Sequence, residues 1–282
     1  MSCRPGAVVA YNGADAGLGN RMRVTLGASR YATHRDLPFF YVWPSGPKFE
    51  PLLTDLWEWR SGMRVPRGLS RAAAKLTDYV GSDLRELNSR RVIQIRTGNE
   101  LTLPCEAGDW RDDLRALVPV SEIADVVTRL HQGELGDQPY VGIQLRVHDV
   151  SHTKTKNSSP IEWFTDRMRR ILTERPGTRF YVSCDKLDVK QRVLREFPTA
   201  SAHVIPAAYN STAAVRAAIV DLYLLASSSY MLGPHFSSFI EMAQFLADMK
   251  VPTDKPEECS KNVQSWWELP PAPDPLSPAS GR

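Results

Sequence analysis

Short apolar runs alternate with longer amphipathic segments along most of the chain. The apolar runs are typical of buried strands, and the segments between them repeat their apolar residues at helical spacing. Strands separated by helices predict an α/β fold built from βαβ units with parallel sheets. We expect strands at 7–11, 38–43, 91–96, 140–146, 178–183, 203–205 and 230–233, and helices at 21–34, 110–117, 121–132, 159–175, 188–197, 213–226 and from 238 onward.

A turn-rich segment over 132–139 interrupts this alternation, and the strand and helix pattern starts again after it. A chain of 282 residues is long enough for two domains. We therefore expect two domains, 1–136 and 137–250, followed by a C-terminal extension over 251–282. The prolines that follow Leu269 predict an extended and poorly ordered end for this extension.

Two helix starts have a strong local signature. Ser159 is expected to cap its helix, with Pro160 at the first helical position and Glu162 completing a capping box. Ser238 and Glu241 have the same spacing at the start of the last helix.

Composition and charge exclude several classes of protein. The formal net charge of +3 is small for a nucleic-acid-binding domain, so no nucleic acid partner is expected. No apolar run is long enough to span a bilayer, and the first residues lack the pattern of a secretion signal. The four cysteines have neither a zinc-site spacing nor a disulfide framework. We expect a cytoplasmic protein without an integral membrane segment.

The loops that follow strands are the places where open parallel sheets bind ligands. The first such loop contains a glycine-rich turn that leads into a helix, where backbone N–H groups can approach an anion. It has neither the dinucleotide pattern nor a Walker loop, and a plain tight turn explains its spacing equally well. The residues of this turn are Gly17, Leu18, Gly19, Asn20 and Arg21.

Arg146 stands at the end of a predicted strand, and His148, Asp149 and His152 follow it. An arginine held by a strand at this edge can bind a diphosphate through two parallel hydrogen bonds. An ion pair with Asp149 is the alternative. The two histidines have no third ligand at a convincing spacing, so no metal is expected.

Asp221 and a pair of serines complete the candidate site in the second domain. Asp221 lies in the apolar run 217–225, and a buried carboxylate must either pair within the protein or face a ligand. Ser237 and Ser238 stand at the start of the final helix, where hydroxyls, free N–H groups and the helix dipole favour an anion. Helix capping alone explains one of the two serines. Together with Arg146, these residues predict a nucleoside-diphosphate pocket.

Six segments of the chain occur in the order seen in fucosyltransferases of the nodulation protein Z, α1,6 and protein O-fucosyl type. The segments are 17–21, 142–149, 160–164, 180–185, 220–226 and 236–241, and the chain resembles this superfamily over most of residues 7–247. The resemblance implies a GT-B glycosyltransferase fold, with two Rossmann-like domains facing across a cleft. The first domain would lie on the acceptor side, and the second would bind the nucleotide-sugar.

The resemblance also implies an activity. It implies an inverting, metal-independent glycosyltransferase that moves a sugar from a nucleotide-sugar donor to an acceptor hydroxyl. The donor would be GDP-fucose or a related GDP-hexose, and the acceptor would be a small molecule or a glycan. The donor is a cosubstrate, so no cofactor is expected.

Individual roles follow from the same resemblance. Arg146 would hold the β-phosphate and the glycosidic oxygen, and the turn 17–21 would close on the nucleotide. The other residues assigned to the donor are Gln144, Asp185 and Asp221 on the nucleoside side, and His235, Phe236, Ser237 and Ser238 on the diphosphate side.

The chain departs from the superfamily at the expected base. Gln144 stands where a histidine is usual, and Lys154 falls near the position of the glutamate that the α1,6 enzymes use as general base. Asp149, His148 and His152 are the nearest replacements.

We expect the acceptor hydroxyl to attack the sugar C1 while Arg146 and the helix start at Ser238 take up charge on the leaving diphosphate. A noncatalytic nucleotide-sugar-binding protein, or a transferase of another sugar in a bacterial secondary-metabolite or cell-surface glycan pathway, is an alternative. A phosphoryl transferase is disfavoured because no Walker loop and no carboxylate pair for Mg²⁺ is evident.

Overall fold

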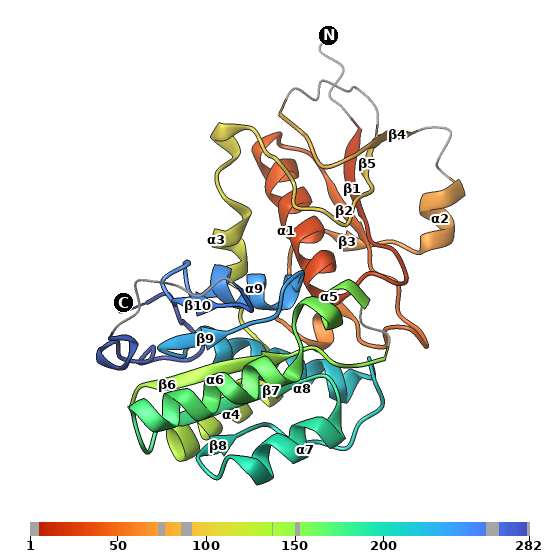
Figure 1. Ribbon diagram of the computed structural model, residues 1–282. Helices are drawn as coiled ribbons and strands as arrows, with labels where there is room; N and C mark the ends of the chain where they lie inside the picture. Colours follow the sequence, from red (N-terminus) through yellow and green to blue (C-terminus); the bar gives the residue numbers. More distant parts are fainter. Residues whose placement is uncertain are drawn as a thin grey trace. The chain divides into compact units, whose positions relative to one another are not determined.

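The structure, a computed structural model, describes residues 6–72, 77–85, 92–136, 138–149, 153–257 and 265–280 (Figure 1). It forms two compact units, one of residues 1–118 with 210–212 and one of residues 119–209 with 213–282. The division falls before the helix α4 (Ser121–Leu130), whereas the sequence pattern placed it after residue 136. We describe each unit by itself.

The first unit contains a parallel sheet. Its strands are β1 (Ala7–Tyr11), β2 (Phe39–Val42), β3 (Met63–Arg64), β4 (Thr77–Val80) and β5 (Val92–Ile95), in the order β3-β2-β1-β5-β4. The central strand β1 is buried along its whole length, as expected for a parallel strand covered on both faces.

Helix α1 (Leu18–His34) packs along this sheet, as Figure 1 shows. Asn12, directly after β1, donates from Nδ2 to the Thr25 hydroxyl of α1 at 3.0 Å. On the outer side, Arg30 of α1 forms an ion pair at 2.7 Å with Asp113 of α3 (Trp110–Arg115). A shorter helix, α2, covers Arg67–Ala72. These contacts hold α1 so that its first turn lies at the carboxyl edge of the sheet.

The second unit contains another parallel sheet. Its strands are β6 (Tyr140–Leu145), β7 (Arg179–Cys184), β8 (Ala200–Ser201), β9 (Tyr230–Leu232) and β10 (Thr253–Asp254), in the order β10-β9-β6-β7-β8. Its helices are α4, α5 (Thr153–Ser158), α6 (Ile161–Glu174), α7 (Leu187–Glu196), α8 (Thr212–Ala226) and α9 (Ser238–Leu246).

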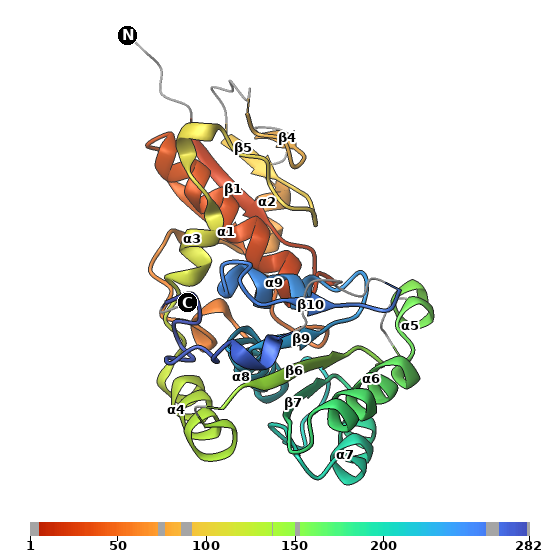
Figure 2. The same cartoon turned by 60° about the vertical axis from the view of Figure 1, so that its left-hand side comes forward.

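Alternate residues of β6 face different helices. Val141, Ile143 and Leu145 belong to a core cluster with residues of α6 and α7. On the other face, a side chain at Gly142 would place its Cβ 2.9 Å from the Ser228 hydroxyl and 3.0 Å from Leu225 at the end of α8. Helices therefore cover both faces of the sheet (Figure 2), which is the doubly wound arrangement. The mixed α/β class and the parallel sheets confirm the predicted fold class.

Residues 265–280 pack onto the second unit, so the expectation of a poorly ordered tail after Leu269 is wrong for the described residues 269–280. Trp266 is buried and stacks on Tyr230 with ring centroids 5.6 Å apart. Ala272 is buried and donates its backbone N–H to the Ser227 carbonyl at 2.9 Å. Prolines lose little conformational entropy on ordering, so a few such contacts suffice to hold the segment.

Local predictions differ from the structure in a few places. Residues 203–205 form no strand; the edge strand is β8 instead, and the Lys190 ammonium binds the His203 carbonyl at 2.9 Å. In α6 the capping position is Pro160 and the first helical residue is Ile161, one position later than expected for each, because the Ser159 hydroxyl accepts the His235 N–H at 2.8 Å rather than capping the helix. In α9 the capping position is Ser237, with Ser238 as the first helical residue.

Within the described residues, no helix has both the length and the apolar character needed to cross a bilayer.

Candidate functional site

Arg146 directly follows β6, at the carboxyl edge of the second unit's sheet, and leads into a loop held by Asp185. One carboxylate oxygen of Asp185, in the loop after β7, accepts the backbone N–H groups of Val147 and His148 at 2.8 and 2.9 Å. These bonds fix the direction of the chain beyond Arg146. The structure thus gives Asp185 a loop-shaping contact, and its predicted place beside the base stays a prediction.

Tyr209 is a residue of this site that the sequence did not indicate. Its ring stacks on the His148 imidazole, with centroids 4.0 Å apart and planes inclined by 20°. The Arg146 guanidinium lies within hydrogen-bonding reach of its hydroxyl. Partial burial raises the pKa of Tyr209 above its ordinary value while Arg146 opposes that rise, so the phenol remains protonated at neutral pH.

The start of α9 lies beside the end of β6. The Ser237 hydroxyl, at the capping position of α9, donates to Oε1 of Gln144 at 3.0 Å, and both residues are buried. Ser238 follows as the first residue of the helix and is partly exposed. The free N–H groups and positive dipole end of α9 therefore lie on the same strand edge as Arg146.

The loop between β9 and α9 is held closely against its surroundings. A Cβ at Gly233 would lie 2.7 Å from Cγ1 of Ile240, so only glycine fits this approach. His235 uses Nε2 in a contact of 2.6 Å with the Pro256 carbonyl, in addition to its N–H bond to Ser159. Phe236 has a left-handed backbone with φ of 54°. Its ring is exposed, and the Lys154 ammonium lies 3.9 Å from the centroid of that ring.

Asp221, a residue of α8, is buried, and its carboxylate is bound by two side chains of the protein. Its Oδ1 accepts from the Tyr181 hydroxyl at 2.6 Å, and its Oδ2 lies 3.6 Å from the Lys190 ammonium. Burial and the neighbouring carboxylate raise the pKa of Tyr181 well above its ordinary value, so it stays a donor. These partners satisfy the carboxylate in the structure, and a contact between Asp221 and a nucleoside stays a prediction.

Two of the proposed bases are described. Asp149 is exposed and lies 3.6 Å from the Lys186 ammonium. His148 is held by the stack on Tyr209 and by its backbone bond to Asp185. His152 lies outside the described residues.

The glycine-rich turn belongs to the first unit, where it forms the start of α1. Gly17 is the capping residue, Leu18, Gly19 and Asn20 form the first turn, and Arg21 is buried. The Arg21 guanidinium donates to the carbonyl oxygens of Ala16, Pro44 and Ala14 at 2.8, 2.9 and 3.2 Å. Burial lowers its pKa to about 10, which leaves it charged at neutral pH. The Arg21 guanidinium therefore holds loop carbonyls of its own unit together.

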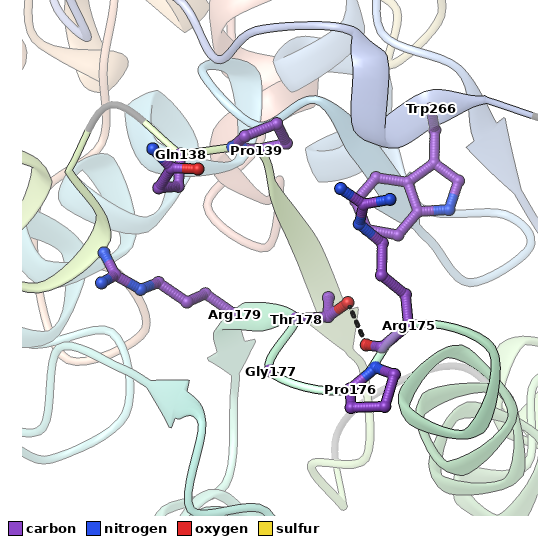
Figure 3. Close-up of a pocket in the computed structure, with 8 residues that line it drawn as sticks. All are labelled: Gln138, Pro139, Arg175, Pro176, Gly177, Thr178, Arg179 and Trp266. Carbon is purple, nitrogen blue, oxygen red and sulfur yellow. Dashed lines mark hydrogen bonds between the residues drawn. The ribbon is translucent and has the colours of Figure 1, made fainter.

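Each unit also carries a pocket. In the second unit, a pocket of about 270 Å³ is lined by Arg175, Thr178, Arg179 and Trp266, among others (Figure 3). It lies where β6 and β7 begin, at the edge of the sheet opposite to Arg146. A larger pocket of about 590 Å³ lies in the first unit, beyond the carboxyl ends of β1, β2 and β3.

Among the described residues, no group of three or more histidine, cysteine, aspartate or glutamate side chains is placed to hold a metal ion.

Comparisons with known proteins bear on the fold. The chain is similar to the crystal structure of fucosyltransferase NodZ from Bradyrhizobium, with a TM-score of 0.59 and 14% identity over 86% of this chain and 93% of that one. It is also similar to POFUT1 in complex with GDP, with a TM-score of 0.50 and 12% identity over 89% of this chain and 99% of that one. The fold is that of the GT-B fucosyltransferases.

A mutant of FUT1 from Arabidopsis thaliana in complex with GDP has the same fold, with a TM-score of 0.55 and 13% identity over 95% of this chain and 73% of that one. No protein-family model matches the chain, and no curated protein matches it. The resemblance to fucosyltransferases is therefore confirmed at the level of the fold.

Proposed function

We propose that the protein is a glycosyltransferase that moves a sugar from a GDP-sugar to an acceptor hydroxyl, with inversion at the anomeric carbon and without a metal ion. The observation that carries the proposal is the placement of Arg146 beside the start of α9, linked through the hydrogen bond from Ser237 to Gln144. This arrangement occurs in a chain with the fold of NodZ, which has been crystallised with GDP and soaked with GDP-fucose.

The charge at this edge suits a diphosphate. A guanidinium can donate two parallel hydrogen bonds to phosphate oxygens, and the start of a nine-residue helix adds N–H donors and its dipole. Such fixed donors stabilise negative charge as it develops on a leaving group. In this proposal Arg146 and α9 do the work that a metal ion does in other transferases.

The step is a direct displacement. The acceptor oxygen forms a bond to the sugar C1 as the bond from C1 to the diphosphate oxygen breaks, and its electron pair leaves with the diphosphate. The acceptor proton passes to Asp149 or His148, the described candidates nearest to Arg146 in the loop. Tyr209 keeps both His148 and Arg146 in place. Fucose is the sugar that the structural neighbours favour.

Nucleotide binding is the first test. Wild-type protein is titrated calorimetrically with GDP, UDP and dTDP, beside Arg146→Ala and the control Arg195→Ala, which removes an exposed arginine of α7. We expect GDP to bind best, and to bind Arg195→Ala as it binds wild type, while Arg146→Ala loses affinity. Equal binding of all nucleotides, or none, would overturn the proposal.

Turnover is the second test. Incubation with GDP-fucose and other GDP-hexoses, with EDTA present, should release GDP faster when a suitable acceptor is added. Binding of GDP without turnover would instead indicate a nucleotide-sugar-binding protein. That alternative is favoured by Lys154, which falls near the position of the family's base and here lies over the Phe236 ring.

A further inference from the structure

The pocket of the first unit lies where parallel sheets commonly bind ligands, beyond the carboxyl ends of their strands. Its volume is about 590 Å³, and all of its lining residues belong to the first unit. They come from the loop after β1 (Ala14), from the end of β2 and its following loop (42–49), and from β3 and its following loop (64–67). We call it the 42–67 pocket.

The wall of this pocket is aromatic and firmly held. Trp43 and Phe49 are buried and meet edge to face with centroids 6.0 Å apart, and the Trp43 Nε1 donates to the Pro51 carbonyl at 2.9 Å. The Arg21 guanidinium lies 4.1 Å from the Phe49 ring centroid and binds the carbonyls of Ala14 and Pro44, two residues that line the pocket. The wall is therefore rigid and has a fixed positive charge against it.

Three cationic side chains line the pocket: Lys48, Arg64 and Arg67. The Arg64 Nε donates to the Trp43 carbonyl at 3.2 Å, and the Arg67 Nε donates to the Tyr11 hydroxyl at 2.8 Å. Among the hydrogen bonds within the described residues 6–72, those that these two guanidinium groups donate both use Nε. Their Nη atoms are thus left to a ligand while the Nε bonds hold the groups in place.

Little negative charge opposes these cations. No aspartate or glutamate occurs among the lining residues. The carboxylate of Asp15, next to the lining residue Ala14, lies 2.5 Å from the Lys48 ammonium. The hydrogen bond and charge of Lys48, with smaller contributions from Arg67 and Arg21, lower the pKa of Asp15, so one carboxylate faces several cations.

We propose that the 42–67 pocket binds a ligand that combines a ring with an oxyanion group, which is a carboxylate, a sulfate or a phosphate. The ring lies against Trp43 and Phe49, and the oxyanion binds Arg64 and Arg67. Arginine pairs hold such planar or tetrahedral oxyanions bidentately, and aromatic walls take the apolar face of a ring. Resting on the proposed function, this ligand is the acceptor, so the transferase acts on an acidic glycoside or similar molecule.

The test uses matched probes that differ in charge. 4-Nitrophenyl β-D-glucuronide and 4-nitrophenyl β-D-glucoside share ring and aglycone, and differ in carrying a carboxylate or a hydroxymethyl group. Phenyl sulfate and phenyl phosphate supply the other two oxyanions, with phenol as their neutral counterpart. Binding is followed by calorimetry on the full chain for wild type, Arg64→Gln with Arg67→Gln, and Arg60→Gln. Arg60 is the control because its exposed side chain pairs with Glu58 outside the pocket.

We expect at least one oxyanion probe to bind wild type about tenfold more tightly than its neutral counterpart does. The same preference should be present in Arg60→Gln and absent from the double variant. Thermal unfolding of each variant confirms that it is folded. The absence of a charge preference for all three oxyanions overturns the inference, as does a preference that survives in the double variant. GDP titration is run alongside: normal GDP binding with no oxyanion preference removes only this inference, whereas absent GDP binding removes the proposed function.

Discussion

The imidazole of His148 lies nearly flat on the phenol ring of Tyr209, with ring centroids 4.0 Å apart. The hydroxyl of the same tyrosine is within reach of the Arg146 guanidinium. One side chain from the loop before α8 therefore positions two candidate groups of the loop after β6. Its contribution can be separated into a stacking part and a hydrogen-bonding part.

Tyr209→Phe keeps the ring and removes the hydroxyl. We expect kcat/KM for GDP-fucose to fall about tenfold, because the net loss of one hydrogen bond to a charged group costs about 1.5 kcal/mol. Tyr209→Ala also removes the stack on His148 and should lower kcat/KM further. Steady-state kinetics check both values, and equal rates for the two variants would show that the stack contributes nothing.

Arg146→Ala should lower the transfer rate by about 10²-fold or more, because it removes a fixed donor for charge on the leaving diphosphate. Arg146→Lys should recover little of this loss, since an ammonium does not reproduce the planar fork of a guanidinium. Wild-type turnover in Arg146→Ala would contradict the assignment. Arg195→Ala serves again as the control, with the melting temperature of all three measured.

The buried pair of Lys190 and Asp221 should show strong coupling. Lys190→Met removes the ammonium 3.6 Å from the Asp221 carboxylate and should lower the free energy of unfolding by about 3 kcal/mol, since a buried charge is left without its cation. Adding Asp221→Asn should restore part of that loss. Urea denaturation of the two single variants and the double variant measures the coupling, and purely additive losses would rule it out.

His203 should make stability depend on pH. Burial lowers its pKa from the ordinary value of 6.5, so the folded state binds fewer protons than the unfolded state when the pH falls below about 6.5. The free energy of unfolding should therefore decrease as the pH is lowered from 7 toward 5. His203→Asn should flatten this part of the curve, and an unchanged slope would show that other groups cause it. Urea denaturation at several pH values provides the comparison.

The long apolar runs of the second unit made its main elements predictable. β6, β7, β9 and the helices α6, α7 and α8 lie within a few residues of their expected ranges, because these strands are buried under helices on both faces of the sheet. The short helix α5 was not predicted, since the sequence pattern indicated a polar loop there. The short edge strands β3, β4 and β10 were not predicted. They hold two to four residues each, too few for a periodic pattern, and they form through pairing with a neighbouring strand.

The placement of the candidate residues was predictable where a residue is fixed by its position at the end of an element, and not where it depends on distant partners. Arg146 and Ser237 follow from the end of a strand and the start of a helix. Asp221 could be recognised as needing a partner, but Tyr181 and Lys190 are brought to it by tertiary packing. Arg21 stands in a turn suited to ligands, yet its guanidinium binds the carbonyls of Ala14 and Ala16 and that of Pro44 in a distant loop.

The packing of β10, Trp266 and Ala272 has a consequence for biosynthesis. They complete the sheet edge and the core of the second unit: β10 pairs with β9, Trp266 stacks on Tyr230, and Ala272 donates a hydrogen bond to Ser227. A ribosome releases these residues well after β6 and α6, so the nascent second unit exposes the surfaces they cover until then. The second unit therefore completes its packing only after these residues have been made, and a chaperone that shields this edge during translation would raise the yield of folded protein.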